Sequence, residues 1–138
     1  MKRVIHDLEI KNMLRLANDA MDRAYAPYSG YQSGACLKGA SGAYYLGCNI
    51  ENASLTATIC AERAAIYKAV TEGERTYDAL AIISTGMQPT VPCGLCRQVL
   101  SEMCDPGMPV ICANRSGKYQ VFYVSDLLPQ PFSSEDMR

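Results

Sequence analysis

The chain has 138 residues, of which 49% are hydrophobic and 20% charged. These values are typical of one globular domain over residues 1–138 and argue against disorder, and no window approaches the roughly 20 apolar residues of a membrane-spanning helix. The formal net charge of -1 argues against a nucleic-acid polymer as partner, because such binding draws on a positive surface field.

The first half of the chain predicts two helices separated by a hairpin. Apolar residues recur every three or four positions over residues 7–25, which predicts an amphipathic helix. Two short strands around a turn at residues 39–42 predict an antiparallel hairpin. Residues 60–70 are strong helix formers, and we expect Thr58 to be the N-cap and Gly73 to stop this helix.

The second half alternates strands and helices. The apolar run at 78–85 predicts a buried strand, and Pro92 is expected to open a helix that extends to residue 103. Two further strands are predicted at 109–114 and 118–124, followed by a short helical turn. This order predicts an α/β fold, a three-layer α/β/α sandwich with a mixed sheet of about five strands.

Seven cysteines form an odd set without the compact spacing of a disulfide framework, which is typical of a reducing compartment. Together with the absence of a signal-peptide pattern, this favours a cytoplasmic location. Cys93 and Cys96 form a C-x-x-C pair in PCGLCRQVL. Such a pair has three readings: a structural zinc site, a redox pair, or part of a catalytic metal site.

The three readings make different demands on the remaining sequence. A structural zinc site needs four protein ligands, and no second C-x-x-C or H-x-x-H pair exists. A redox pair needs no further ligand, so counting does not exclude it. A catalytic site needs one more ligand and an open position for water, and Cys60 in TICAER is the best candidate for that ligand.

Cys60 and Cys93 would then each stand at the start of a helix, where the positive end of the helix favours thiolates. Residues 60 and 62 point roughly 200° apart on an ideal helix, so Cys60 and Glu62 can converge only on a metal beyond the helix end. Three thiolates leave zinc with a formal charge of -1, which Arg63 can compensate, with Arg97 as a competing candidate. Glu62 could then move a proton from water to a leaving nitrogen, which is deamination chemistry.

Three segments, CNIENAS (48–54), TICAERAAIYKAV (58–70) and PCGLCRQVL (92–100), together resemble the small cytidine deaminases whose zinc ligands are all cysteines. The resemblance extends from about residue 25 to about residue 137 and includes APYS, SGACL and LLPQPFSSED.

The resemblance implies one Zn²⁺ per chain, bound by Cys60, Cys93 and Cys96, with Glu62 as the proton shuttle. It implies hydrolysis of cytidine or 2′-deoxycytidine, a small nucleoside, in pyrimidine salvage. It also implies a homotetramer with sites at subunit borders. The substrate-binding residues that it implies are Asn49 and Glu51 on the ribose, Tyr31 against the pyrimidine, Ala61 at the base, Ala53 facing an adjacent site, and Phe132 from a neighbouring subunit.

The sequence departs from the family pattern in the wall of the pocket. Tyr31 and Ser33 stand where phenylalanine and valine are common, and Leu55 replaces a common tyrosine. These changes motivate the hypothesis of a broader tolerance for modified cytidines. Deamination of a nucleoside analogue such as blasticidin S, editing of a polynucleotide, and a non-catalytic zinc-binding interaction module are the alternatives.

Overall fold

A five-stranded sheet organises the computed structural model, which describes residues 1–138. The strands lie in the order β2-β1-β3-β4-β5, and only β3 and β4 run parallel. The mixed sheet of five strands is therefore as predicted. The strands are β1 (Ser33–Gly39), β2 (Tyr44–Cys48), β3 (Tyr77–Ser84), β4 (Pro109–Asn114) and β5 (Tyr119–Tyr123).

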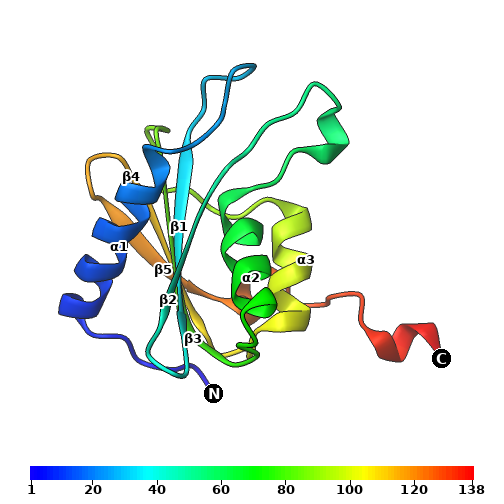
Figure 1. The fold of residues 1–138 in the computed structure, drawn as a ribbon. Coiled ribbons are helices and arrows are strands. Elements are labelled where there is room, and N and C mark those ends of the chain that lie inside the picture. The colour runs from blue at the N-terminus through cyan, green and yellow to red at the C-terminus, as the bar shows by residue number, and fades with distance from the viewer.

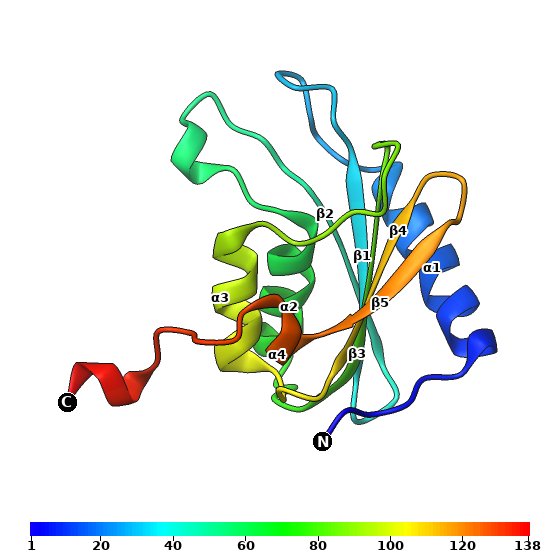
Figure 2. The same ribbon diagram turned by 180° about the vertical axis from the view of Figure 1, so that it is seen from behind.

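Helices cover both faces of this sheet, which confirms the three-layer prediction (Figures 1 and 2). The helices are α1 (Asp7–Met21), α2 (Ala61–Thr71), α3 (Gly94–Met103) and α4 (Val124–Leu127), with short 3₁₀ turns at Leu55–Ala57 and Ser134–Met137. Helix α1 packs alone on one face, while α2, α3 and α4 share the other (Figure 2). No helix has both the length and the apolar character needed to cross a membrane.

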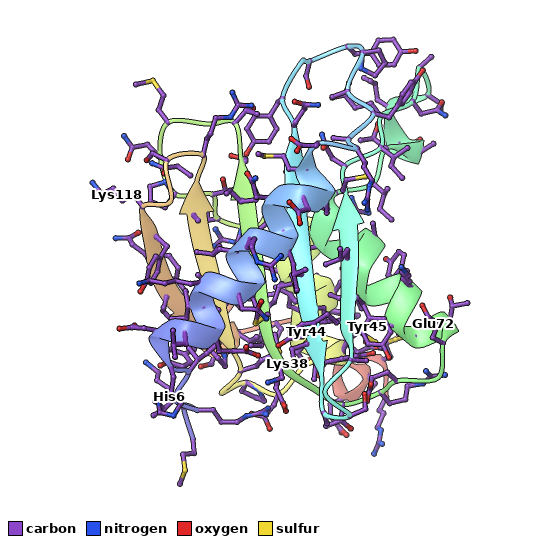
Figure 3. The ribbon with its side chains drawn as sticks, turned by 60° about the vertical axis from the view of Figure 1, so that its left-hand side comes forward. His6, Lys38, Tyr44, Tyr45, Glu72 and Lys118 are labelled. Atoms are coloured by element: carbon purple, nitrogen blue, oxygen red, sulfur yellow. The ribbon has the colours of Figure 1, made fainter.

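A polar cluster at one end of the sheet joins α1 to the strands beneath it. Lys38 lies opposite Tyr44 in the β1–β2 register, and Figure 3 shows the two side chains close together. The Lys38 ammonium lies 2.7 Å from a Glu9 carboxylate oxygen, and the Tyr44 hydroxyl donates to the same oxygen at 2.9 Å. Glu9 therefore fastens α1 to both strands of the hairpin, away from the loops at the opposite end.

The start of α2 differs from the sequence prediction. Thr58 is not the N-cap, because the chain stays extended while Ile59 pairs with Ile50, and α2 begins at Ala61 with Cys60 as N-cap. The Thr58 hydroxyl instead accepts a hydrogen bond from the backbone of Asn52 at 3.2 Å. Helix α3 likewise begins after Cys93, its N-cap, so Pro92 precedes the helix instead of opening it. Both helices thus start directly after a cysteine.

Strand β2 lies directly against the first turns of α2. A methyl group on Gly47 would overlap the carbonyl oxygen of Ala61 and approach the backbone nitrogen of Ala65 at 2.6 Å. Glycine is therefore required here by close approach of two backbones. Because Cys60 and Glu62 lie at this end of α2, Gly47 also sets where these two side chains stand relative to the sheet.

We predict that Gly47→Ala lowers the free energy of unfolding by about 1–3 kcal/mol, the usual cost of overpacking, and weakens zinc binding because α2 must shift. Gly34→Ala is the matched control. Its methyl would overlap the Ala17 carbonyl on α1, on the other face, so it should destabilise comparably and leave zinc affinity unchanged. Urea unfolding and competitive zinc titration measure the two quantities. A Gly47→Ala protein with wild-type stability and zinc affinity would contradict this role.

Candidate metal centre and active site

The sulfur atoms of Cys60, Cys93 and Cys96 meet at the N-terminal ends of α2 and α3. All three lie within 4.8 Å of one another. The Cys60 and Cys93 sulfurs are 3.7 Å apart, and those of Cys93 and Cys96 are 3.3 Å apart. The structure thus brings together the C-x-x-C pair and the third cysteine that the sequence analysis selected.

These separations fit a tetrahedral zinc site. With zinc–sulfur bonds of about 2.3 Å, two cysteine ligands stand about 3.7 Å apart. The three residues supply three ligands, and Cys93 is exposed while Cys96 is buried. The group therefore closes one side of a metal ion and leaves the other side open, as a catalytic zinc site requires and a structural one does not.

The charges around the sulfurs also favour a cation. The hydrogen bond from Cys96 and the nearby Arg63 guanidinium lower the pKa of Cys60 to about 5. The same hydrogen bond to Cys60 holds the proton on Cys96 and raises the pKa of that thiol. Three sulfurs so close together cannot all lose their protons without compensation. A divalent cation provides it and binds all three as thiolates.

Arg63 is the positive side chain that contacts the sulfurs. Its Nη2 donates to the Cys60 sulfur at 3.5 Å, and its buried Nε has no hydrogen-bond partner. Arg97, the competing candidate, is used elsewhere: its Nε donates to the Pro92 carbonyl at 2.7 Å and its Nη1 to the Leu127 carbonyl at 3.1 Å. Arg97 therefore ties the start of α3 to α4, while Arg63 is placed to offset thiolate charge.

Glu62 lies in the first turn of α2, one residue past Ala61, and is only 4% exposed. Burial raises the pKa of its carboxyl group to about 7, and the nearby Cys60 thiolate acts in the same direction. A carboxyl group with this pKa can accept a proton and release it again near neutral pH. Glu62 is therefore suited to general acid–base chemistry beside the three sulfurs.

A cavity of about 600 Å³ opens onto this site. Its lining contains Cys60, Glu62 and Cys93 together with Tyr31, so an aromatic ring, an acid and two of the sulfurs face one space. The remaining lining is mostly apolar, with Arg97 as its only basic residue. The volume and the mixture of apolar walls with a few polar groups are typical of small-ligand sites.

The other expected substrate-binding residues lie around this cavity without lining it. Glu51 lines a neighbouring hollow of about 370 Å³ together with Leu55. Asn49 is buried, and Ala61 is buried next to Glu62. Ala53 is exposed in the loop after β2.

Phe132 is 61% exposed on the C-terminal segment, which extends away from the body of the protein (Figure 1). Within one chain, Phe132 does not reach the cavity of the three cysteines. Its carbonyl accepts a hydrogen bond from Gln98 on α3 at 2.7 Å.

Several lining residues lie outside the cysteine motifs. Thr90 and Val91 precede the C-x-x-C pair, and Leu127 and Leu128 come from α4 and the residue after it. A Ser84–Thr90 hydroxyl contact pins the loop between β3 and α3, and Gly86 also donates to the Ser84 hydroxyl at 3.0 Å. No spacing rule marks these residues, because the loop after β3 and helix α4 bring them to the cavity from distant parts of the chain.

Comparisons with known proteins agree with this chemistry. The family model for the cytidine and deoxycytidylate deaminase zinc-binding region matches residues 8–112. The chain belongs to this family.

Curated relatives and solved structures give the same assignment. A cytidine deaminase of Sporosarcina psychrophila is 42% identical over 130 residues, covering 94% of this chain and 96% of the relative. One from Halalkalibacterium halodurans is 44% identical over 125 residues, with 91% and 95% covered. The crystal structure of cytidine deaminase from Burkholderia pseudomallei has a TM-score of 0.86 at 39% identity, covering 88% of this chain and 98% of that one. The predicted membership of the cytidine deaminases and the predicted fold are thereby confirmed.

We predict that Cys93→Ala reduces bound zinc from about one ion per chain to a small fraction, because two sulfurs no longer complete the site. Cys48→Ala is the matched control, since Cys48 is a half-buried free cysteine outside the cluster. Metal content after dialysis against a weak chelator measures the effect. Retention of stoichiometric zinc by Cys93→Ala would contradict the three-sulfur site.

Proposed function

We propose that this protein catalyses the zinc-dependent hydrolytic deamination of cytidine and 2′-deoxycytidine to uridine and 2′-deoxyuridine, releasing ammonia. The observation that carries the proposal is the joint opening of the sulfur cluster and the buried Glu62 onto one cavity. Membership of the deaminase family and the names of the relatives support the substrate.

Zinc held by the three cysteines would lower the pKa of a water molecule and so supply a nucleophile at neutral pH. Glu62 takes a proton from this water and delivers it to N3 of the pyrimidine as oxygen adds at C4. Glu62 then carries the second proton of the water to the exocyclic nitrogen, which leaves C4 as ammonia. The same carboxyl group accepts and donates, and its burial beside the three sulfurs suits it to both steps.

The base would lie beside Tyr31, and the sugar would extend toward Glu51 and Asn49. The Asn49 amide already accepts from the Ser33 backbone nitrogen at 2.9 Å and donates to the Tyr31 carbonyl at 2.7 Å. One amide N–H of Asn49 remains for a sugar hydroxyl. Ser33 is buried and lies outside the cavity lining, so a change in substrate range would come from Tyr31, which lines the cavity, or from Leu55, which lies beside Glu51.

The protein would act as a homotetramer in the cytoplasm, in pyrimidine salvage. The extended C-terminal segment and its exposed Phe132 favour an assembly in which this ring enters a neighbour's site (Figure 2). Ala53, on the exposed loop after β2, would face an adjacent site in the same assembly. Seven free cysteines favour a reducing compartment.

The alternatives lack support of this kind. A non-catalytic zinc module would close its fourth position, whereas here the sulfurs face a cavity with an acid in it. A polynucleotide substrate would need several basic side chains around the cavity to bind its phosphates, and the cavity lining contains one arginine. Nothing in the structure favours a nucleoside analogue such as blasticidin S over cytidine itself.

We predict that Glu62→Gln lowers kcat on cytidine by roughly 10²- to 10⁴-fold, the range expected for loss of a general acid–base group, while zinc stays bound. The ultraviolet change on conversion to uridine gives the rate, and metal analysis gives the zinc content. Glu72→Gln is the matched control, because Glu72 lies at the opposite end of α2 (Figure 3). An active Glu62→Gln enzyme would refute the assigned role.

Mixing two defective subunits tests whether sites lie at subunit borders. Glu62→Gln and Phe132→Ala should each be impaired alone at cytidine concentrations far below the wild-type KM. Co-expressed in equal amounts, they should regain activity in about a quarter of the sites, since random assembly then joins an intact Glu62 with an intact Phe132 from another chain. Light scattering gives the oligomeric state. Activity no higher than the mean of the two parents would show that each chain completes its own site.

A further inference from the structure

The Glu51 carboxylate is held by the turn that follows Tyr25. One carboxylate oxygen of Glu51 accepts hydrogen bonds from the backbone nitrogens of Tyr28 at 2.9 Å and Ser29 at 3.2 Å. The other carboxylate oxygen accepts from the Ser29 hydroxyl. Glu51 is thus gripped by three donors from two consecutive residues, although Ser29 itself is exposed.

The Ser29 hydroxyl has a second partner. Its oxygen accepts a hydrogen bond from the backbone nitrogen of Tyr31 at 3.0 Å. Ser29 therefore stands between the carboxylate of Glu51 and the backbone of the residue whose ring lines the cavity. The link continues from there, because the Tyr31 carbonyl accepts from the Asn49 amide at 2.7 Å. A single hydroxyl joins the two sides of the proposed substrate site.

The lone pairs of Glu51 that no protein donor uses are the ones available to a substrate. A carboxylate oxygen accepts about two hydrogen bonds, so the oxygen bonded to both backbone nitrogens is saturated. The oxygen bonded to Ser29 has one acceptor position left. Three donors also stabilise the ionised form, and the Ser29 hydroxyl, followed by the Tyr28 backbone, lowers the pKa of the Glu51 carboxyl group. Glu51 therefore offers one fixed acceptor position and no donor.

We infer that Ser29 is a positioning residue for sugar recognition, which aims the free acceptor position of Glu51 at one hydroxyl of the substrate. This inference rests on the proposed function. Because that function includes both cytidine and 2′-deoxycytidine, the recognised hydroxyl must be one that both carry, at the 3′ or the 5′ position. Ser29 does not touch the reacting atoms, so it should act on substrate affinity and leave the chemical step unchanged.

The test compares Ser29→Ala on three substrates: 2′-deoxycytidine, 2′,3′-dideoxycytidine and 2′,5′-dideoxycytidine. For 2′-deoxycytidine we expect KM to rise about tenfold with kcat within about twofold of wild type, the size expected for one hydrogen bond to a charged group. For the dideoxy substrate that lacks the recognised hydroxyl, the KM of Ser29→Ala should stay within about twofold of the wild-type KM on that substrate. The discrimination at issue is the lower KM for 2′-deoxycytidine than for the dideoxy substrate that lacks the recognised hydroxyl. Ser29→Thr, which keeps a hydroxyl, should restore most of this difference in KM.

Ser54→Ala is the matched control, because Ser54 is exposed in the loop after Glu51 and its side chain caps nothing. It should leave all three KM values unchanged. Equal KM increases on all three substrates for Ser29→Ala would mean that the serine only stabilises the loop, and unchanged KM values would mean that it does nothing. Either result overturns the inference, and thermal unfolding of each variant checks that it is folded.

Glu51→Gln separates this inference from the function on which it rests. If Glu51→Gln abolishes the discrimination between the substrates and Ser29→Ala does not, the proposed function stands and the role of Ser29 is wrong. If Glu51→Gln leaves the discrimination intact, the sugar contact of Glu51 is wrong, and the inference about Ser29 is overturned with it. Wild-type protein that releases no ammonia from cytidine would refute the proposed function itself.

Discussion

The structure depends on the meeting of two helix N-termini over three sulfur atoms. Cys60 and Cys93 are the N-caps of α2 and α3, so each sulfur lies where a helix presents free N–H groups and partial positive charge. Cys96, one turn into α3, adds the third sulfur, and its backbone nitrogen donates to Cys93 at 3.4 Å. The two helix ends and Arg63 offset the negative charge that three thiolates bring to one metal.

This meeting is possible because of the way in which the sheet connects the two helices. Helix α3 joins β3 to β4, the only parallel pair in the sheet, and thereby shares a face with α2. Gly47 lets α2 approach β2 closely, which fixes the depth of Glu62. Beyond the sheet, Asn49 and Glu51 bind the segment that carries Tyr31. One loop thus holds Tyr31 and Glu51 in a single hydrogen-bonded frame.

Local patterns identified the helices and most of the chemistry. Apolar residues that recur every three or four positions predicted α1, and continuous apolar runs predicted β3 and β4. These signals depend only on residues that are close together in the chain. The spacing of Cys93 and Cys96 and the position of Glu62 after Cys60 pointed to a metal-assisted hydrolysis. The N-cap of α2 was misassigned, since the bridge between Ile59 and Ile50 keeps the chain extended past Thr58 and involves residues nine positions apart.

The sequence by itself determined the α/β architecture and singled out the three cysteines and Glu62, because residue chemistry and short-range periodicity depend on residues that are close together in the chain. Only the tertiary structure decided that Arg63 and not Arg97 contacts the sulfurs, that burial raises the pKa of Glu62, and that Ser29 holds Glu51. Each of these depends on a distance between segments that lie in different elements. Such distances are set by packing of helices on the sheet, and no local pattern records them.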